Sequence, residues 1–189
     1  LVRAPPTVYP IKECPMRLLA LLTLVLSLFT PLAQAAGLYQ IEVIVFRQAG
    51  EQVPASQLAP DDWSIGSQAL AAGSERGTAL NGEAAKLIPA NGYQVLLHQA
   101  WSQNLSASPS TVALTAGNQS FGHYPLEGTL SLSEERLIDL GANLWVNQFD
   151  AEGILVGSEQ LKQSTRIATG KLTYVDHGSL GMLIRVNSL

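Results

Sequence analysis

The chain has 189 residues, of which 47% are hydrophobic and 14% are charged, and its net charge at pH 7 is −4. The charge is uneven, because residues 36–159 contain four basic and thirteen acidic residues, whereas residues 160–189 contain four basic residues and one acidic residue. The acidic body argues against nucleic acid or an anionic membrane surface as the main partner, and the basic C-terminal segment favours a ligand that carries carboxylates.

The first predicted element is a secretory signal peptide over residues 16–35. Met16 and Arg17 provide a start and a positive charge, residues 18–29 are almost entirely apolar, and residues 33–35 (AQA) form a small-x-small cleavage site. The apolar run is shorter than the roughly 20 residues that span a bilayer. We therefore expect cleavage, an exported mature domain over residues 36–189 and no stable membrane anchor; the alternative is a retained N-terminal anchor.

Residues 1–15 precede this predicted start, and we interpret them as an upstream, non-native extension. They contain Cys14, the one cysteine of the chain. A mature domain without cysteine has no disulfide, no thiolate nucleophile, no zinc–thiolate site and no thiol for lipid attachment. Residues 36–189 suffice for one ordinary domain that is held together by its own core.

The first half of the mature domain is predicted to contain one strand, a long loop and a short helix. Residues 38–47 (LYQIEVIVFR) carry apolar side chains on both faces, which is typical of an interior strand. Residues 48–79 are rich in glycine, proline and small polar side chains, which predicts a long surface loop, and loops of this length are usually functional or mobile. A helix is predicted over residues 81–88, with Asn81 as its N-cap and an exit at residues 89–92.

The second half is predicted to consist of short strands. The clearest pair is a hairpin in which apolar residues alternate with polar ones on both arms and the turn lies at residues 133–135. The predicted strands cover residues 93–101, 111–115, 126–132, 138–146, 161–169, 171–175 and 182–186. We therefore predict the α+β class: a single domain with a mostly antiparallel sheet of about five to seven strands, one or two short helices and long loops.

Sequence motifs for catalysis and metal binding are absent from the mature chain, which contains no G-x-S-x-G, S-x-x-K or H-E-x-x-H pattern. We predict no catalytic residue, no metal and no cofactor. Asp176 and His177 are adjacent, but consecutive strand residues point to opposite faces, which disfavours a hydrogen-bonded acid–base pair. Glu134 and Glu135 are predicted to be solvated in a hairpin turn, which argues against glycoside hydrolysis.

A binding surface is the better reading of the polar faces. Sugar rings are commonly held by aromatic stacking together with hydrogen bonds from amide and carboxylate groups. Trp63 in the long loop and Trp145 on a predicted solvent-exposed strand face are candidates for stacking. Side chains on one face of the strand over residues 161–169 are candidates for binding the carboxylates of stem peptides or an acidic partner. The predicted ligand-binding residues are Lys162, Ser164, Arg166, Trp63, Trp145, Asp176 and His177.

Four segments of the chain, taken in order, resemble the CsiV family of Gram-negative periplasmic peptidoglycan-binding proteins. They are YQIEVIVFRQ at residues 39–48, GYQVLLHQAW at 92–101, LEGTLSL at 126–132 and GKLTYVDHGSLGMLIRV at 170–186. Arg166 is the one arginine in residues 163–169, where the family is richer in arginine, and Gly178 stands where the family commonly has proline.

The resemblance implies a non-enzymatic peptidoglycan-binding protein that acts as an adaptor or regulator of wall synthesis and cell-shape integrity, through a class A penicillin-binding protein. Two other functions stay open at this point. One is an envelope interaction or assembly factor that docks a partner through residues 48–79 and binds no glycan. The other is a wall hydrolase that uses Asp176 and His177.

Overall fold

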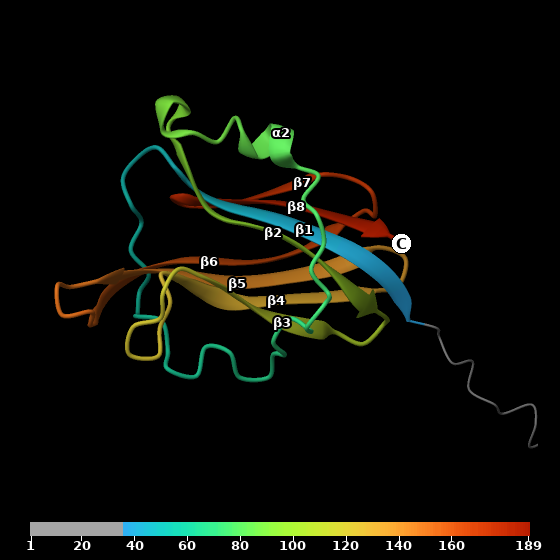
Figure 1. The fold of residues 1–189 in the computed structure, drawn as a ribbon, viewed down its shortest axis with the longest axis horizontal. Helices are drawn as coiled ribbons and strands as arrows, with labels where there is room; N and C mark the ends of the chain where they lie inside the picture. The colour runs from blue at the N-terminus through green and yellow to red at the C-terminus, as the bar shows by residue number, and fades with distance from the viewer. Residues whose placement is uncertain (1–35) are drawn as a thin grey trace, which may run out of the picture. The chain divides into compact units, whose positions relative to one another are not determined.

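The computed structural model describes residues 36–189, which fold into two four-stranded antiparallel sheets (Figure 1). Sheet A has the strand order β2-β1-β8-β7, and sheet B has the order β3-β4-β5-β6. The strands are β1 (Gly37–Gln48), β2 (Tyr93–Leu105), β3 (Ser110–Ala116), β4 (Leu126–Glu134), β5 (Ile138–Phe149), β6 (Leu155–Ile167), β7 (Thr173–His177) and β8 (Leu180–Ser188). The predicted signal peptide and upstream extension lie outside the described residues.

The predicted α+β class is wrong, because the described domain is nearly all β. Its helices are α2 (Asn81–Ala84) and the 3₁₀ turn η1 (Pro89–Asn91), of four and three residues. The predicted helix is cut short for two local reasons. Gly82 disfavours helix in its first turn, and the Asn81 side chain donates to the Thr78 carbonyl instead of capping the helix.

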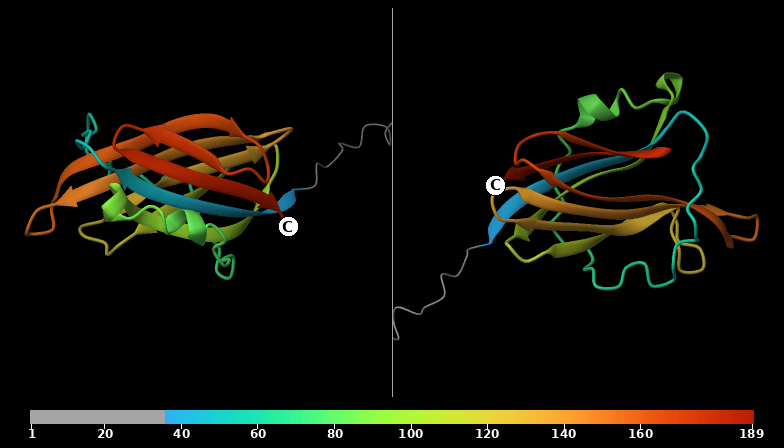
Figure 2. Two further views of the ribbon diagram at one scale, coloured as in Figure 1. Left: turned by 90° about the horizontal axis from the view of Figure 1, so that it is seen from above. Right: turned by 180° about the vertical axis from the view of Figure 1, so that it is seen from behind.

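The eight strands form a meander in which neighbours in a sheet are also neighbours in sequence, and β1 pairs with β8 to join the two ends. Hydrogen bonding between strands is interrupted at two places, which we call seams: one between β2 and β3, the other between β6 and β7. The two sheets pack face to face, and the seams lie along the two edges where one sheet meets the other (Figures 1 and 2). The predicted count of five to seven strands in one sheet is therefore also wrong.

The main core lies between the sheets and is built by the strand alternation that the sequence shows. On β1 the inward side chains include Ile41, Val43 and Val45, and β4 and β5 contribute the alternating leucines of the predicted hairpin. A second, smaller core covers the outer face of sheet A, where Leu80 packs with Ile44 and Phe46. Both faces of β1 are thus buried, as predicted for an interior strand.

Residues 49–80, which we call the strap, connect β1 to α2 by way of both seams. The strap pairs with β6 at Pro54, with β3 at Gln68 and with β2 at Glu75. In Figure 1 it leaves β1, passes β6 and returns below β3 before rising to α2. Main-chain hydrogen bonds therefore anchor much of this predicted loop to the sheets.

Candidate functional site

The outer face of sheet B carries a row of small polar residues that crosses all four strands. The register pairs Thr111 with Ser131, Ser131 with Gly141 and Gly141 with Ser164. The Thr111 hydroxyl donates to the Ser131 hydroxyl oxygen over 3.0 Å. Because adjacent strands contribute one residue each, the row presents the hydroxyl groups of Thr111, Ser131 and Ser164 across the sheet, with a gap at Gly141.

Rows on either side of it add amide and charged groups. On one side Ser133 pairs with Asp139, which pairs with Arg166. On the other side Asn143 pairs with Lys162 on the next strand, and Gln160 Nε2 donates to Asn143 Oδ1 over 2.8 Å. The three predicted residues of β6, namely Lys162, Ser164 and Arg166, therefore do share one exposed face of the sheet.

A shallow groove of about 410 Å³ lies over the central row. Gly141 forms part of its floor between the side chains of Ser131 and Ser164. A Cβ atom at Gly141 would lie 3.7 Å from the Ser131 Cβ, an ordinary contact, so the strand itself does not require glycine here. The missing side chain leaves the centre of the face open, which suits a ligand that approaches the strands closely.

Charged residues close one end of the groove. Arg166 Nε donates to Asp139 Oδ1 over 2.8 Å, and this ion pair is exposed, since 73% of the arginine side chain is accessible. The hydrogen bond and charge of Asp139 raise the pKa of Arg166 above its usual value. A second pocket of about 470 Å³ shares both residues and adds Glu135, Arg136 and Leu137 from the β4–β5 turn. The hydroxyl row thus leads directly into a site with two guanidinium groups.

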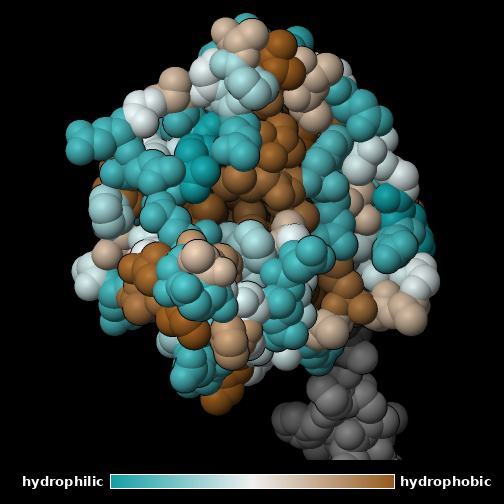
Figure 3. All heavy atoms as spheres, turned by 60° about the vertical axis from the view of Figure 1, so that its left-hand side comes forward, coloured by the Kyte–Doolittle hydropathy of each residue, from teal (hydrophilic) through white to brown (hydrophobic). Residues whose placement is uncertain are grey.

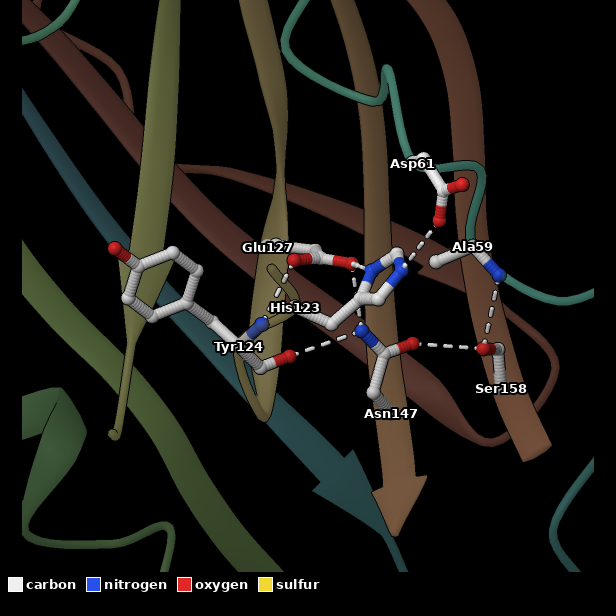
Figure 4. A network of polar contacts seen from close by, with 7 residues as sticks. All are labelled: Ala59, Asp61, His123, Tyr124, Glu127, Asn147 and Ser158. Atoms are coloured by element: carbon white, nitrogen blue, oxygen red, sulfur yellow. Dashed lines mark hydrogen bonds and ion pairs between the residues drawn. The ribbon is translucent and has the colours of Figure 1, made fainter. Parts of the chain in front are cut away.

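The part of the outer face of sheet B around Glu127 and Asn147 is covered by the strap, which a buried polar network holds in place (Figure 4). Glu127 is fully buried and accepts hydrogen bonds from the Tyr124 amide and from Asn147 Nδ2, at 2.8 and 2.7 Å. The Ser158 hydroxyl donates to Asn147 Oδ1 and accepts from the Ala59 amide of the strap.

His123 joins this network to a second point of the strap. Its Nδ1 lies 2.6 Å from Glu127 Oε1, and its Nε2 lies 3.2 Å from Asp61 Oδ1. Burial by itself would lower the pKa of His123, but the hydrogen bonds and charges of Glu127 and Asp61 outweigh it and raise the pKa. The two carboxylates face opposite ring nitrogens, and no group of three or more potential ligands among residues 36–189 is arranged to hold a metal ion. We interpret the network as an anchor of the strap.

The two predicted tryptophans have different outcomes. Trp145 lies on the outer face, opposite Glu127 and Gln160, but it is only 2% exposed and cannot stack on a ligand. The strap is anchored next to it, so a long-range connection buries a position that strand alternation alone places in solvent. Trp63 lies in the strap, is half-buried and packs edge-on against Tyr124 at 6.4 Å between ring centres.

Asp176 and His177 lie on β7 in sheet A, away from the groove on sheet B. Asp176 accepts a hydrogen bond from the Gln48 side chain over 2.7 Å. The register places Asp176 opposite Gly181 and His177 opposite Leu180, so the two side chains point to opposite faces. This geometry does not form the acid–base pair that a hydrolase site here requires.

Sequence reasoning missed most of the groove. Ser131 and Ser133 stand at the polar positions of the predicted β4 strand, and this alternation was the available signal. Gly141 and Asp139 occupy the matching positions on β5. What the sequence does not contain is the register that aligns these positions with Ser164 and Arg166.

A family comparison covers the whole of the described domain. The model of the CsiV family, described as "Peptidoglycan-binding protein, CsiV", matches residues 17–79 and 65–189. The chain belongs to the CsiV family. No curated protein and no solved structure matches the chain. Within residues 36–189, none of the helices is long and apolar enough to span a membrane.

CsiV proteins are described as binding peptidoglycan, which agrees with the resemblance drawn from the four sequence segments. Peptidoglycan offers two kinds of groups, the hydroxyl and acetamido groups of its glycan strands and the charged groups of its stem peptides. Both kinds have chemically suitable partners on the uncovered part of sheet B. The comparison itself places no ligand on any residue.

Proposed function

We propose that this CsiV-family protein binds peptidoglycan on the uncovered outer face of sheet B. The observation that carries the proposal is the row Thr111–Ser131–Gly141–Ser164. Ser131, Gly141 and Ser164 of this row line a hydroxyl-bearing groove with Arg166, and Lys162 lies on the same face. Sugar recognition relies on short polar side chains that hydrogen-bond hydroxyl and acetamido groups. Glycan strands are expected along the groove.

The stem peptides are proposed to meet the charged end of the same face. Their carboxylates match the guanidinium groups of Arg136 and Arg166 at that end, because arginine pairs with carboxylates through two parallel hydrogen bonds. The ammonium group of Lys162, on the other side of the central row, is a further partner for a carboxylate. Asp139 and Glu135 are suited to hold the Arg166 side chain in place or to meet an amino group of the peptide. The proposed function requires binding only, with no chemistry by this chain.

Co-sedimentation with protein-free sacculi across a salt series tests the proposal. The variant carrying Lys162→Gln and Arg166→Gln is expected to lower the bound fraction about threefold to tenfold at low salt, as for two exposed charge contacts. The matched control carries Lys86→Gln and Lys171→Gln, which remove the same charge from exposed positions outside the groove. Equal losses in both variants would mean non-specific attraction, and no pelleting of the unaltered protein would refute the proposal.

The cellular role is proposed on the family resemblance. We infer that residues 16–35 are removed on export, that the domain acts in the periplasm, and that it serves as an adaptor of wall synthesis for a class A penicillin-binding protein. The N-terminal sequence of the protein recovered from the periplasm tests the first two points; a mature chain that starts near residue 36 is expected. Cross-linking in intact cells tests the third.

A further inference from the structure

The seam between β2 and β3 is filled by the strap in one half only. In the filled half, the Gln68 amide donates to the Thr111 carbonyl, and the Ala113 amide donates to the Gln68 carbonyl, at 2.9 and 2.8 Å. On the other edge, the Arg76 amide donates to the Ala100 carbonyl over 2.9 Å. The strap therefore uses the exposed main-chain groups of both strand edges, as an added strand does.

In the other half of the seam, which we call the open half, main-chain groups of both strand edges also face the seam. Every second residue of an edge strand directs its N–H and C=O groups away from the sheet. Ala113 on β3 and Ala100 on β2 face the seam, so Thr115 and His98 face it too. Facing sheets lie about 10 Å apart and paired strands about 4.8 Å apart, so a gap between two sheets has room for one added strand.

Two pockets flank this open half, and each is lined by both sheets. One, of about 450 Å³, is lined by Trp63, Leu70, Gln99, Thr115 and Tyr124 among others. The second, of about 340 Å³, is lined by apolar residues, including Val95, Leu96 and Leu126, and by the polar residues Arg47, Gln94 and Asn147. Figure 3 views this end of the domain and shows hydrophobic surface running inward between hydrophilic flanks. The pockets suit alternate side chains of an extended segment.

The charge around the open half is negative. Asp61 and Asp62 immediately precede Trp63 and are exposed. The cation in the second pocket, Arg47, is already paired with Glu159 at 2.5 Å. Asp61 is paired with His123 Nε2 at 3.2 Å, so a segment that enters the seam meets the exposed Asp62 carboxylate at the Trp63 end, which favours a basic residue there.

We propose that the open half of the β2–β3 seam binds an extended peptide segment of a partner protein by strand addition. The segment carries apolar side chains at alternate positions and a lysine or arginine at the end near Trp63. Main-chain hydrogen bonds to Thr115 and His98 supply affinity, and the two pockets select the side chains. This site is separate from the groove on sheet B and does not depend on peptidoglycan binding there.

Amide hydrogen exchange on residues 36–189, followed by NMR, tests the proposal. In the free protein the Thr115 and His98 amides are expected to exchange faster than those of Ala113 and Ser102, which the strap protects. The probe is the acetylated and amidated peptide Lys-Val-Thr-Val-Thr-Val-Thr. Its addition is expected to protect Thr115 and His98, and methylation of every second peptide amide is expected to weaken binding about tenfold, as for the loss of one or two hydrogen bonds.

A pair of variants separates main-chain bonding from side-chain contact. Thr115→Pro removes the N–H that faces the seam, whereas Thr115→Ala keeps it, so only the proline variant is expected to lose peptide binding. Should the proline variant fail to fold, the exchange measurement on the unaltered chain still decides. Protection of these amides by a purified disaccharide–tetrapeptide fragment of peptidoglycan but not by the peptide, or protection by neither, would overturn the proposal. Neither result depends on whether the groove on sheet B binds peptidoglycan.

Discussion

The Arg47 guanidinium on β1 lies 2.5 Å from the Glu159 carboxylate on β6 and joins the two sheets across one end of the interior. Glu159 also accepts a hydrogen bond from the Ser179 hydroxyl, which in turn accepts one from the Val53 amide of the strap. The pair therefore connects both sheets and the strap at the β6–β7 seam.

Removing Glu159 is expected to be costly, because the Arg47 guanidinium, whose side chain is only 21% accessible, then loses its charge partner and keeps only Gln94, among the described residues, as a side-chain acceptor. Glu159→Gln should lower the free energy of unfolding by about 3–5 kcal/mol, as for other buried ion pairs that lose one partner. The double variant Arg47→Met with Glu159→Leu should recover much of the loss. Urea unfolding measures both, and equal losses in the single and double variants would contradict the account.

His123 makes the anchor of the strap sensitive to pH. The folded protein holds the His123 proton more tightly than the unfolded chain, because Glu127 and Asp61 raise its pKa. This stabilisation is complete below the unfolded pKa of about 6.5 and is lost as the pH rises through the higher folded pKa.

Between pH 6 and pH 9, the free energy of unfolding of the unaltered domain is therefore expected to fall more than that of the His123→Gln variant. These pH values bracket a histidine pKa of about 6.5. Urea unfolding of both proteins at the two pH values gives the comparison. Parallel pH profiles for the two proteins would show that His123 does not supply the dependence.

Gly128 on β4 is a position where a side chain does not fit. Its φ is 149°, and a Cβ atom would lie 2.2 Å from the Asn143 carbonyl oxygen on β5. Gly128→Ala is expected to destabilise the domain by about 1–3 kcal/mol, as for other overpacked sites. Gly77→Ala is the control, because a Cβ there meets nothing within 4 Å. Thermal unfolding that leaves both variants alike would disprove this reading.

The sequence predicted most strands and the faces they bury, because alternation is a local property. It did not predict the start of β6 at Leu155, since Gly153 and Gly157 look like turn residues although Gly157 lies within the paired strand. The exposure of Trp145 was predicted wrongly because the strap covers that part of the face, and no local pattern encodes where a long connection returns. The division into two sheets is likewise a matter of long-range pairing.

For the candidate site, too, the sequence predicts local spacing but not long-range pairing. Lys162, Ser164 and Arg166 were predicted to share a face from their spacing alone, and they do. Their neighbours Ser131, Gly141 and Asp139 join them only through the register of β4, β5 and β6, which the chain fixes by pairing distant segments.

The most direct test of the proposed groove is to fill it. Gly141→Leu places a side chain between Ser131 and Ser164, where a Cβ meets only ordinary contacts, and Gly77→Leu adds the same side chain at an open position outside the groove. Sacculi pelleting is measured for both variants after thermal unfolding shows that they are as stable as the parent. We expect Gly141→Leu to lose most of the binding and Gly77→Leu to keep it, whereas full binding by Gly141→Leu would place the peptidoglycan site elsewhere on the protein.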